Sequence, residues 1–363
     1  MSFPLQVAVI GGDGIGPEVV DAAMKVLAVA SSAAKCQYES TDFPFCAGHF
    51  LETGHVLDDD DIAELRNFDA ILLGAVGGLP NDPRLAGGVI EKGILLKLRF
   101  ELDQYINLRP VTLYPGIETP LANKTSADID FVCVRENTED LYCGVGGFVR
   151  KGTPYEVSNQ TMVATRFGVE RCIRYAFELA KTRERKQLTL VHKTNVLSFA
   201  GDTWYRAFQE VAEEYPDVTT DYHHVDACCM YMVSRPEVYD VIVVPNMFGD
   251  IITDLGAAIA GGMGIASSGN LNPDGVAPSM FEPVHGSAPD IAGQNLANPI
   301  ATIDSLGLLL RETGRIKDDK SAVKCGEQIG AAVKKVTPSF AGKSLDRSGF
   351  GTDAIAKMVI DEL

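Results

Sequence analysis

Two aspartates on one predicted helix give the first chemical signal in the sequence. The stretch "PNMFGDIITDL", residues 245–255, follows the apolar run "VYDVIVV", and together they predict a buried strand that leads into a helix. On that helix, Asp250 and Asp254 lie one turn apart on the same face, where like charges repel by roughly a few tenths of a kcal/mol. A Mg²⁺ or Mn²⁺ ion would cancel this repulsion, with Asp226 from another loop as a third oxygen ligand. Stabilisation by the dipole at the helix N-terminus would explain Asp250, but it explains Asp254 less well.

Basic side chains stand near the ends of several apolar segments. "INLRP", "VCVREN" and "KLRFELD" place Arg109, Arg135 and Arg99 there, and "LVHKTN" places Lys193 just after a predicted strand. A buried, unpaired guanidinium would be costly. A bidentate grip on a carboxylate therefore suits Arg109 and Arg135 at strand exits, whereas a solvated helix surface suits Arg99. With the three aspartates, these residues predict a site for a small anion and a metal ion.

Two glycine-containing segments raise the question of a nucleotide. "VAVIGGDGIGPE" has a strand, a glycine-rich turn and a helix started by Pro17, but its G-x-G-x-G spacing lacks the third glycine of the dinucleotide fingerprint. A tight turn that needs glycines explains it about as well. "SMFEPVHGSAPDIAGQNLANP" is typical of a long, ordered, functional loop. Its Asp290 could accept hydrogen bonds from a ribose diol, as acidic residues do in NAD sites.

The elements that would position these residues alternate between strand and helix patterns. We expect strands over 6–11, 69–77, 129–137, 187–195 and 240–246, and helices over 16–30, 93–105, 200–215 and 249–262. Such alternation predicts an α/β fold whose functional loops lie at the carboxyl ends of the strands. The chain's 363 residues exceed the usual size of one domain. A change of character near residues 100 and 260 suggests one domain inserted within another.

Composition limits the class of partner and the cellular compartment. The formal charge of −17 comes without any basic block, which argues against a nucleic-acid partner. The N-terminus lacks the features of a signal peptide, and no stretch reaches the ~18 apolar residues of a membrane helix, so we expect a cytoplasmic protein. Eight dispersed cysteines without a C-x-x-C pair predict reduced, mostly buried thiols.

Six motifs taken in order resemble one family over essentially the whole chain. "GDGIGPE", "NLRP", "VRENTE", "HKTN", "NMFGDIITDL" and "EPVHGSAPDIAG" are similar to those of the β-decarboxylating 2-hydroxyacid dehydrogenases, which act on isopropylmalate, isocitrate, homoisocitrate, tartrate or D-malate. The resemblance implies an NAD-dependent, Mg²⁺- or Mn²⁺-dependent enzyme with an isopropylmalate-dehydrogenase-like α/β fold, not a Rossmann fold. It implies two domains around a cleft, namely a discontinuous cofactor-side domain, 1–103 plus 259–363, and a second domain with the dimer interface, 104–258.

The resemblance also implies roles for individual residues. The substrate would meet Arg99, Arg109, Arg135 and Asn195, and the metal would be held by Asp226, Asp250 and Asp254. The cofactor would lie along Ile15, His285, Gly286, Ser287, Ala288, Asp290 and Asn298. Lys193, or a water beside it, would take the hydroxyl proton as hydride leaves, and Tyr142 would protonate the carbon after CO₂ is lost. Lys193 and the metal ligand Asp226, the third catalytic group, would reach the site from the partner subunit of a homodimer.

The resemblance implies that the choice among 2-hydroxy dicarboxylate substrates depends on the helix that carries Arg99, because in this family the distinguishing substituent of the substrate meets that helix. Leu95 and Leu96 stand four and three residues before it, so both are expected on its face of the helix. An isopropyl group gains from burial there, whereas the third carboxylate of isocitrate would be desolvated without compensation. We therefore predict oxidative decarboxylation of 3-isopropylmalate to 2-oxoisocaproate, a step of leucine biosynthesis.

Several departures from the family pattern keep alternatives open. Asn137 and Glu139 are closer to the tartrate and isocitrate enzymes, Asp140 replaces a common glycine, and His192 stands where an aspartate is frequent. A tartrate or D-malate dehydrogenase is therefore the alternative. A non-catalytic regulatory subunit would be expected to lose the lysine, the tyrosine or a metal aspartate, and all of these are present.

Overall fold

The protein is described by a computed structural model that covers residues 4–78, 82–341 and 349–363. Two compact units make up the chain: the first is Met1–Gln104, Thr112–Ser126 and Ala257–Leu363, and the second is Tyr105–Val111 and Ala127–Gly256. Residues 112–126 were expected in the second domain, 104–258, but they pack with the first unit. For example, the Thr119 hydroxyl donates to the carbonyl of Ile259 at 2.6 Å. Within the described residues, no helix is long and apolar enough to cross a membrane.

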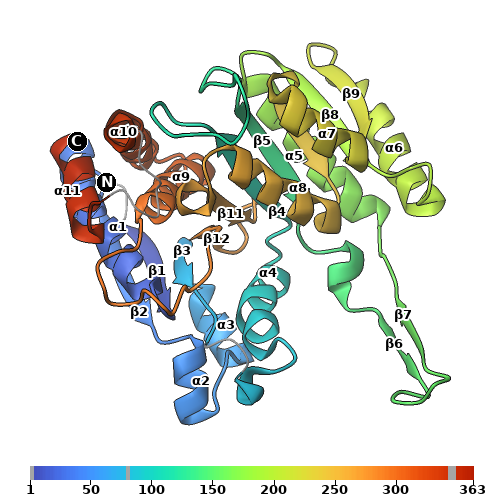
Figure 1. The fold of residues 1–363 in the computed structure, drawn as a ribbon, viewed down its shortest axis with the longest axis horizontal. Coiled ribbons are helices and arrows are strands. Elements are labelled where there is room, and N and C mark those ends of the chain that lie inside the picture. Colours follow the sequence, from blue (N-terminus) through green and yellow to red (C-terminus); the bar gives the residue numbers. More distant parts are fainter. Residues whose placement is uncertain (1–3, 79–81, 342–348) are drawn as a thin grey trace. The chain divides into compact units, whose positions relative to one another are not determined.

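The first unit is built on a mostly parallel sheet (Figure 1). Its strands follow the order β2 (Tyr38–Phe43), β1 (Leu5–Gly12), β3 (Ala70–Ala75), β12 (Ser279–Pro283) and β11 (Ser267–Leu271). The pairs β2–β1, β1–β3 and β3–β12 are parallel, whereas β12–β11 is antiparallel. Every residue of β3, "AILLGA", is buried, as expected for a strand covered on both faces.

Helices surround this sheet and supply the rest of the core. They are α1 (Gly16–Ala34), α2 (Ala47–Thr53), α3 (Asp59–Leu65), α4 (Lys97–Glu101), α9 (Ile300–Ile316), α10 (Lys320–Val336) and α11 (Thr352–Asp361). The shorter turns are η1 (Pro83–Leu85), η2 (Glu91–Leu96), η5 (Met263–Ile265) and η6 (Thr337–Phe340). Helices α9 and α10 approach closely through glycines, since a Cβ on Gly326 would lie 2.4 Å from the carbonyl oxygen of Gly307.

The second unit has its own run of strands with helices between them (Figure 1). The order is β4 (Ile106–Thr112), β5 (Asp130–Glu136), β10 (Val241–Val244), β8 (Gln187–His192) and β9 (Thr219–His224). The pairs β5–β10, β10–β8 and β8–β9 are parallel, so the carboxyl ends of these strands share one edge. The helical elements are η3 (Asp140–Cys143), α5 (Arg166–Thr182), α6 (Ser198–Ala212), α7 (Val225–Ser234), η4 (Pro236–Val238) and α8 (Asn246–Ile259).

A separate hairpin, β6 (Gly146–Val149) and β7 (Val157–Gln160), extends from the second unit (Figure 1). All residues of both strands are exposed. Elsewhere in the chain all eight cysteines are free thiols, and five of them are buried, as the sequence predicted for most of them.

The glycine-rich turn after β1 is packed against the protein's own backbone. Gly12 has φ +80°, and a Cβ there would lie 1.9 Å from the carbonyl oxygen of Ala75. Gly14 has φ +60°, and a Cβ there would lie 1.9 Å from the carbonyl oxygen of Ser287. These glycines therefore serve a tight turn and close backbone packing, which supports the simpler of the two interpretations of this motif.

We predict that Gly12→Ala is far more destabilising than the matched change Gly54→Ala. Both glycines have similar positive φ values, +80° and +75°, but no atom lies within 4 Å of a Cβ on Gly54. The backbone conformation alone costs a non-glycine residue roughly 1–2 kcal/mol at either position, and the clash with β3 adds about 1–3 kcal/mol at Gly12 alone. Urea denaturation of both variants measures the difference. Equal losses of stability would show that the contact with Ala75 is not limiting.

Candidate active site

Helix α8 carries the two aspartates that gave the first signal. It begins at Asn246, three residues before the predicted start, directly after the fully buried strand β10. Asp250 and Asp254 therefore lie beyond the first turn, which contains no acidic residue. The helix-dipole interpretation consequently accounts for neither of them, because that effect fades within the first turn.

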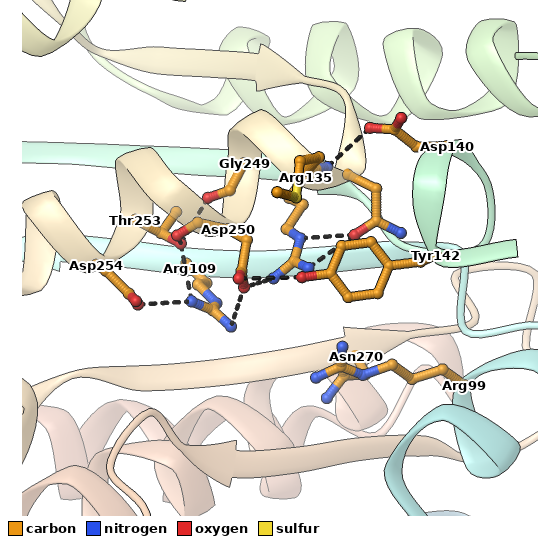
Figure 2. A network of polar contacts seen from close by, with 12 residues as sticks. Arg99, Arg109, Arg135, Asp140, Tyr142, Gly249, Asp250, Thr253, Asp254 and Asn270 are labelled. Carbon is orange, nitrogen blue, oxygen red and sulfur yellow. Dashed lines mark hydrogen bonds and ion pairs between the residues drawn. The ribbon is translucent and has the colours of Figure 1, made fainter. Parts of the chain in front are cut away.

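Two arginines face these aspartates in the second unit (Figure 2). Arg135, at the end of β5 and only 1% exposed, donates from Nη1 to Oδ1 of Asp250 at 2.5 Å, and from Nε and Nη2 to Oδ1 of Asn246 at 3.0 and 2.7 Å. Arg109 of β4 lies 3.9 Å from Asp250 and 3.6 Å from Asp254. The two guanidinium groups thus already offset the repulsion between Asp250 and Asp254, which the sequence alone suggested that a metal ion would cancel. The expected grip on a carboxylate is formed with the chain's own Asp250.

Tyr142 completes this network from the turn η3. Its hydroxyl donates to Oδ2 of Asp250 at 3.0 Å, and the Arg135 guanidinium lies 5.2 Å from its ring centroid (Figure 2). Burial and the neighbouring Asp250 raise the pKa of Tyr142. Burial alone would raise the pKa of Asp250, but Arg135, Arg109 and the hydrogen bond from Tyr142 together lower it. At neutral pH the tyrosine is therefore protonated and Asp250 is charged.

The carboxylates of Asp250 and Asp254 fit a divalent cation in type and accessibility. Their side chains are 39% and 62% exposed, and both offer hard oxygen ligands. The two positive charges of the guanidiniums equal the two negative charges of the carboxylates. A divalent cation bound together with a dicarboxylate substrate would leave the net charge of the site unchanged. Among the described residues, Asp226 does not join Asp250 and Asp254 in a cluster with ligand atoms within 4.8 Å of one another.

Asp226 instead pairs with Lys193 elsewhere in the second unit. Lys193 lies in the turn after β8, and its Nζ is 2.8 Å from both carboxylate oxygens of Asp226 in the first turn of α7. The hydrogen bond from Lys193 lowers the pKa of Asp226. Asn195 is exposed two residues after Lys193 in the same turn. The predicted catalytic lysine and its aspartate are thus adjacent, although the chain does not bring them to the α8 carboxylates.

Arg99 lies in the first unit and is not the solvated surface residue that its helix suggested. It is 8% exposed, and its Nη2 is 3.1 Å from Oε1 of Glu282, which also accepts from Nδ2 of Asn270 at 2.8 Å. Glu282 and Asn270 were missed by the sequence analysis. An acidic residue within the segment "SMFEP", which forms a fully buried strand, was the available signal, since a buried charge needs a partner.

The predicted substrate-specificity segment is not a regular α-helix. Residues Glu91–Leu96 form a π-helix, and α4 follows it. Leu95 is half-buried against the core of the first unit, and Leu96 is also half-buried. The wider π turn changes the angular spacing within this segment from that of a regular α-helix. The assignment of Leu95 and Leu96 to the substrate stays a prediction.

The residues predicted to hold the cofactor gather in the first unit. The backbone amide of Ile15 donates to the carbonyl of Ser287 at 2.8 Å, and the Ile15 side chain packs in a cluster with Ala288. Gly286 and Asp290 are exposed beside them, whereas Asn298 is half-buried and accepts from the amide of Ile300. Burial lowers the pKa of His285, the first residue of this loop.

Asp13 is a further residue of this region that the sequence analysis missed. Its carboxylate accepts hydrogen bonds from the backbone amides of Ala47, Gly48 and Gly77 at 2.8, 3.0 and 3.0 Å. These amides come from the segments after β2 and β3, so Asp13 ties together the loops at the carboxyl ends of three strands. Its position in "GDGIG" was the only signal.

Comparison with known proteins decides the family. Residues 6–359 match the family model described as isocitrate/isopropylmalate dehydrogenase. The chain belongs to the isocitrate/isopropylmalate dehydrogenase family. It is 59% identical over 346 residues to 3-isopropylmalate dehydrogenase of Clavibacter sepedonicus, covering 93% of this chain and 97% of that one. It is 54% identical over 329 residues to the Corynebacterium glutamicum enzyme of the same name, covering 91% and 93%.

A solved structure of the family has the same fold. Isocitrate dehydrogenase from Methylococcus capsulatus matches with a TM-score of 0.85 at 33% identity, covering 99% of both chains. The predicted family and its α/β fold are therefore confirmed. Membership of the isocitrate/isopropylmalate dehydrogenase family also makes this chain a decarboxylating hydroxyacid dehydrogenase, as the motifs predicted.

His192 departs from the family pattern and is buried in an aromatic cluster. It is fully buried, 6.1 Å from Trp204 and 5.9 Å from Phe248 between ring centroids. Neither ring nitrogen has a hydrogen-bond partner among the described residues. Burial lowers the pKa of His192 to about 4, so the folded protein holds this ring neutral.

We predict that the buried His192 makes the folded protein less stable as the pH falls below about 6.5. Between its unfolded pKa of about 6.5 and its folded pKa of about 4, only the unfolded chain binds the proton, so the free energy of unfolding falls as the pH falls through this range. The full effect is on the order of 3 kcal/mol and is absent above pH ~7. Urea denaturation from pH 7.5 to 4.5 should show a shallower pH dependence for His192→Gln than for wild type. Parallel curves would contradict the assignment.

Proposed function

We propose that this protein catalyses the NAD⁺-dependent oxidative decarboxylation of 3-isopropylmalate to 2-oxoisocaproate, a step of leucine biosynthesis in the cytoplasm. The observation that carries the proposal is the constellation of Arg109, Arg135, Tyr142, Asp250 and Asp254 (Figure 2). It combines two anion-binding groups, a proton donor and two metal-ligand carboxylates. The relatives cited above with more than half their residues identical carry the name of this activity.

The residues of the second unit suit the separate requirements of this reaction. Arg109 and Arg135 would bind carboxylates of the malate core through charge-assisted hydrogen bonds. Mg²⁺ or Mn²⁺ held by Asp250 and Asp254 would lower the pKa of the substrate hydroxyl and stabilise negative charge as CO₂ leaves. Tyr142, protonated at neutral pH, would deliver its proton to the carbon that lost CO₂. Lys193, released from Asp226, would serve as the base for the hydroxyl proton.

In the first unit, Arg99 and the cofactor-side loops have complementary roles. We assign Arg99 to a substrate carboxylate, because its Nε has no hydrogen-bond partner among the described residues although its Nη2 is paired with Glu282. NAD⁺ would lie along 285–290 beside Ile15, with Asn298 at the adenosine half. The exposed carboxylate of Asp290 can accept from ribose hydroxyls and would repel the 2′-phosphate of NADP⁺.

A second copy of this chain would complete the enzyme. The hairpin β6–β7 and its turn expose a run of apolar side chains, namely Val145, Phe148, Val149, Tyr155 and Val157. An isolated two-stranded hairpin is marginally stable in water, and these residues would be covered in a homodimer. Val196 and Phe199, which follow Lys193 in the sequence, are 67% and 90% exposed and would also be covered by a partner subunit. Through such an interface Lys193 and Asp226 would reach the partner's α8 carboxylates.

Three of the four departures that kept tartrate and D-malate open, namely Glu139, Asp140 and His192, have structural explanations. Glu139 accepts from the amide and hydroxyl of Thr165, the N-cap residue of α5. Asp140 accepts from the amide of Met247 in α8, and His192 fills an aromatic cluster. Each of these side chains thus has a role in the folding of the second unit that does not depend on the substrate.

The proposed substrate is tested by a panel of 3-isopropylmalate, D-malate, tartrate and isocitrate with the purified protein. We expect the highest kcat/KM for 3-isopropylmalate with NAD⁺, by at least about 10-fold, because burial of each methylene-sized group contributes about 0.8 kcal/mol. NADP⁺ should be the poorer cofactor, and removal of divalent cations with EDTA should abolish turnover until Mg²⁺ or Mn²⁺ is restored. A higher kcat/KM for D-malate or tartrate would overturn the substrate assignment.

A further inference from the structure

Asp140 has a backbone conformation that is unusual for its residue type. It is 2% exposed with φ +69°, in the region that favours glycine, and it opens the turn η3 that carries Tyr142 two residues later. An aspartate tolerates this region better than most residues but is still less suited to it than glycine. A buried carboxylate in such a conformation requires a compensating interaction.

That interaction is with the beginning of α8. Oδ2 of Asp140 accepts from the backbone amide of Met247 at 2.8 Å (Figure 2). Its Oδ1 accepts from the amide of Leu141 at 2.8 Å. In return, Nδ2 of Asn246 donates to the carbonyl of Glu139 at 3.2 Å. Two hydrogen bonds in opposite directions thus join the turn of Tyr142 to the first two residues of α8.

These contacts close a ring with the groups of the active site. Asn246 accepts from Arg135, Arg135 donates to Asp250, and Asp250 accepts from the hydroxyl of Tyr142. The Tyr142 ring therefore has two connections to α8, one through its hydroxyl and one through the backbone of its own turn. Without the Asp140 carboxylate, the second connection would be reduced to the bond between Asn246 and Glu139.

We propose that Asp140 is a positioning residue that fixes the proton donor Tyr142 against α8 by accepting the Met247 amide. The inference rests on the proposed function of Tyr142 and does not require Asp140 to touch the substrate. A carboxylate at this position replaces the conformational freedom of glycine with a fixed bond to the helix that carries Asp250 and Asp254.

The bond itself is tested by hydrogen–deuterium exchange of a peptide that contains Met247. Asp140→Gly keeps a residue suited to positive φ and removes only the acceptor, so we expect exchange at the Met247 amide to accelerate by about 10-fold or more. Asp318→Gly is the matched control, because Asp318 also has positive φ, +53°, and is exposed between α9 and α10. Unchanged exchange at Met247 in Asp140→Gly would overturn the proposal.

The consequence for proton transfer is tested on the same variants with Tyr142→Phe as a reference. In D₂O, the enzyme with NADH and Mg²⁺ should replace a C3 hydrogen of 2-oxoisocaproate by deuterium, because the group that protonates this carbon also removes its proton in reverse. We expect Asp140→Gly to lower both kcat and this exchange rate by about 10-fold or more, with KM changed by less than about threefold. Asp140→Asn, which retains one acceptor oxygen, should fall between wild type and Asp140→Gly, and Asp318→Gly should match wild type.

The outcomes separate this inference from the proposed function. If Tyr142→Phe loses exchange and turnover but Asp140→Gly does not, the positioning role is wrong and the function of Tyr142 stands. If Tyr142→Phe keeps wild-type exchange and kcat, the assigned proton donor is wrong, and the positioning proposal is overturned with it. A uniform loss of thermal stability with proportionate changes in kcat and KM would identify Asp140 as a purely structural residue and would also contradict the proposal.

Discussion

The contact between Arg135 and Asp250 is the interaction on which the site depends. Arg135 is among the largest fully buried side chains, and a buried guanidinium is tolerable only with charged and hydrogen-bonded partners. Asp250 and Asn246 supply them from successive turns of α8. Gly249 is glycine for the same reason, since a Cβ there would lie 2.5 Å from Cγ of Arg135. The strand β5 and the helix α8 are therefore matched to each other through one side chain.

From this contact the electrostatic design of the second unit follows. The positive charges of Arg109 and Arg135 balance the negative charges of the two aspartates on one face of α8. Partial burial alone would raise the pKa of Asp250 and favour its neutral form, but the two arginines lower this pKa and keep Asp250 ionised. The neighbouring Asp254 is less well compensated, and burial together with the charge of Asp250 raises its pKa. A divalent cation would favour the charged form of both carboxylates, and a dicarboxylate substrate would restore the balance.

Sequence patterns predicted the parts of this arrangement that are local. The strand before α8, the shared face of Asp250 and Asp254, and the position of Lys193 after β8 all follow from hydrophobic periodicity over about ten residues. The long helix α9, by contrast, was not predicted, and its buried residues include the polar Thr302, Asp304 and Ser305, which interrupt the apolar pattern of a buried element.

Pairings between distant segments could not be predicted in this way. Arg135 and Asp250 are 115 positions apart, and Arg99 and Glu282 are 183 apart, so each contact depends on the strand order of its unit. The π-helix at Glu91–Leu96 and the positive φ of Asp140 are also invisible to residue patterns, because both are backbone responses to tertiary packing. The sequence could therefore indicate candidate site residues, but it could not indicate which of them contact one another in the folded chain.

The central claim is that Asp250, held by Arg135, binds the divalent cation. Calorimetric titration of Mn²⁺ into the protein saturated with 3-isopropylmalate tests it most directly, with Asp250→Asn compared against Asp202→Asn, a change at an exposed helical aspartate that pairs with Arg206. We predict that Asp250→Asn weakens Mn²⁺ binding by about 10-fold or more, since one charged ligand is lost, while Asp202→Asn binds as wild type. Equal Kd values for wild type and a correctly folded Asp250→Asn would contradict the claim.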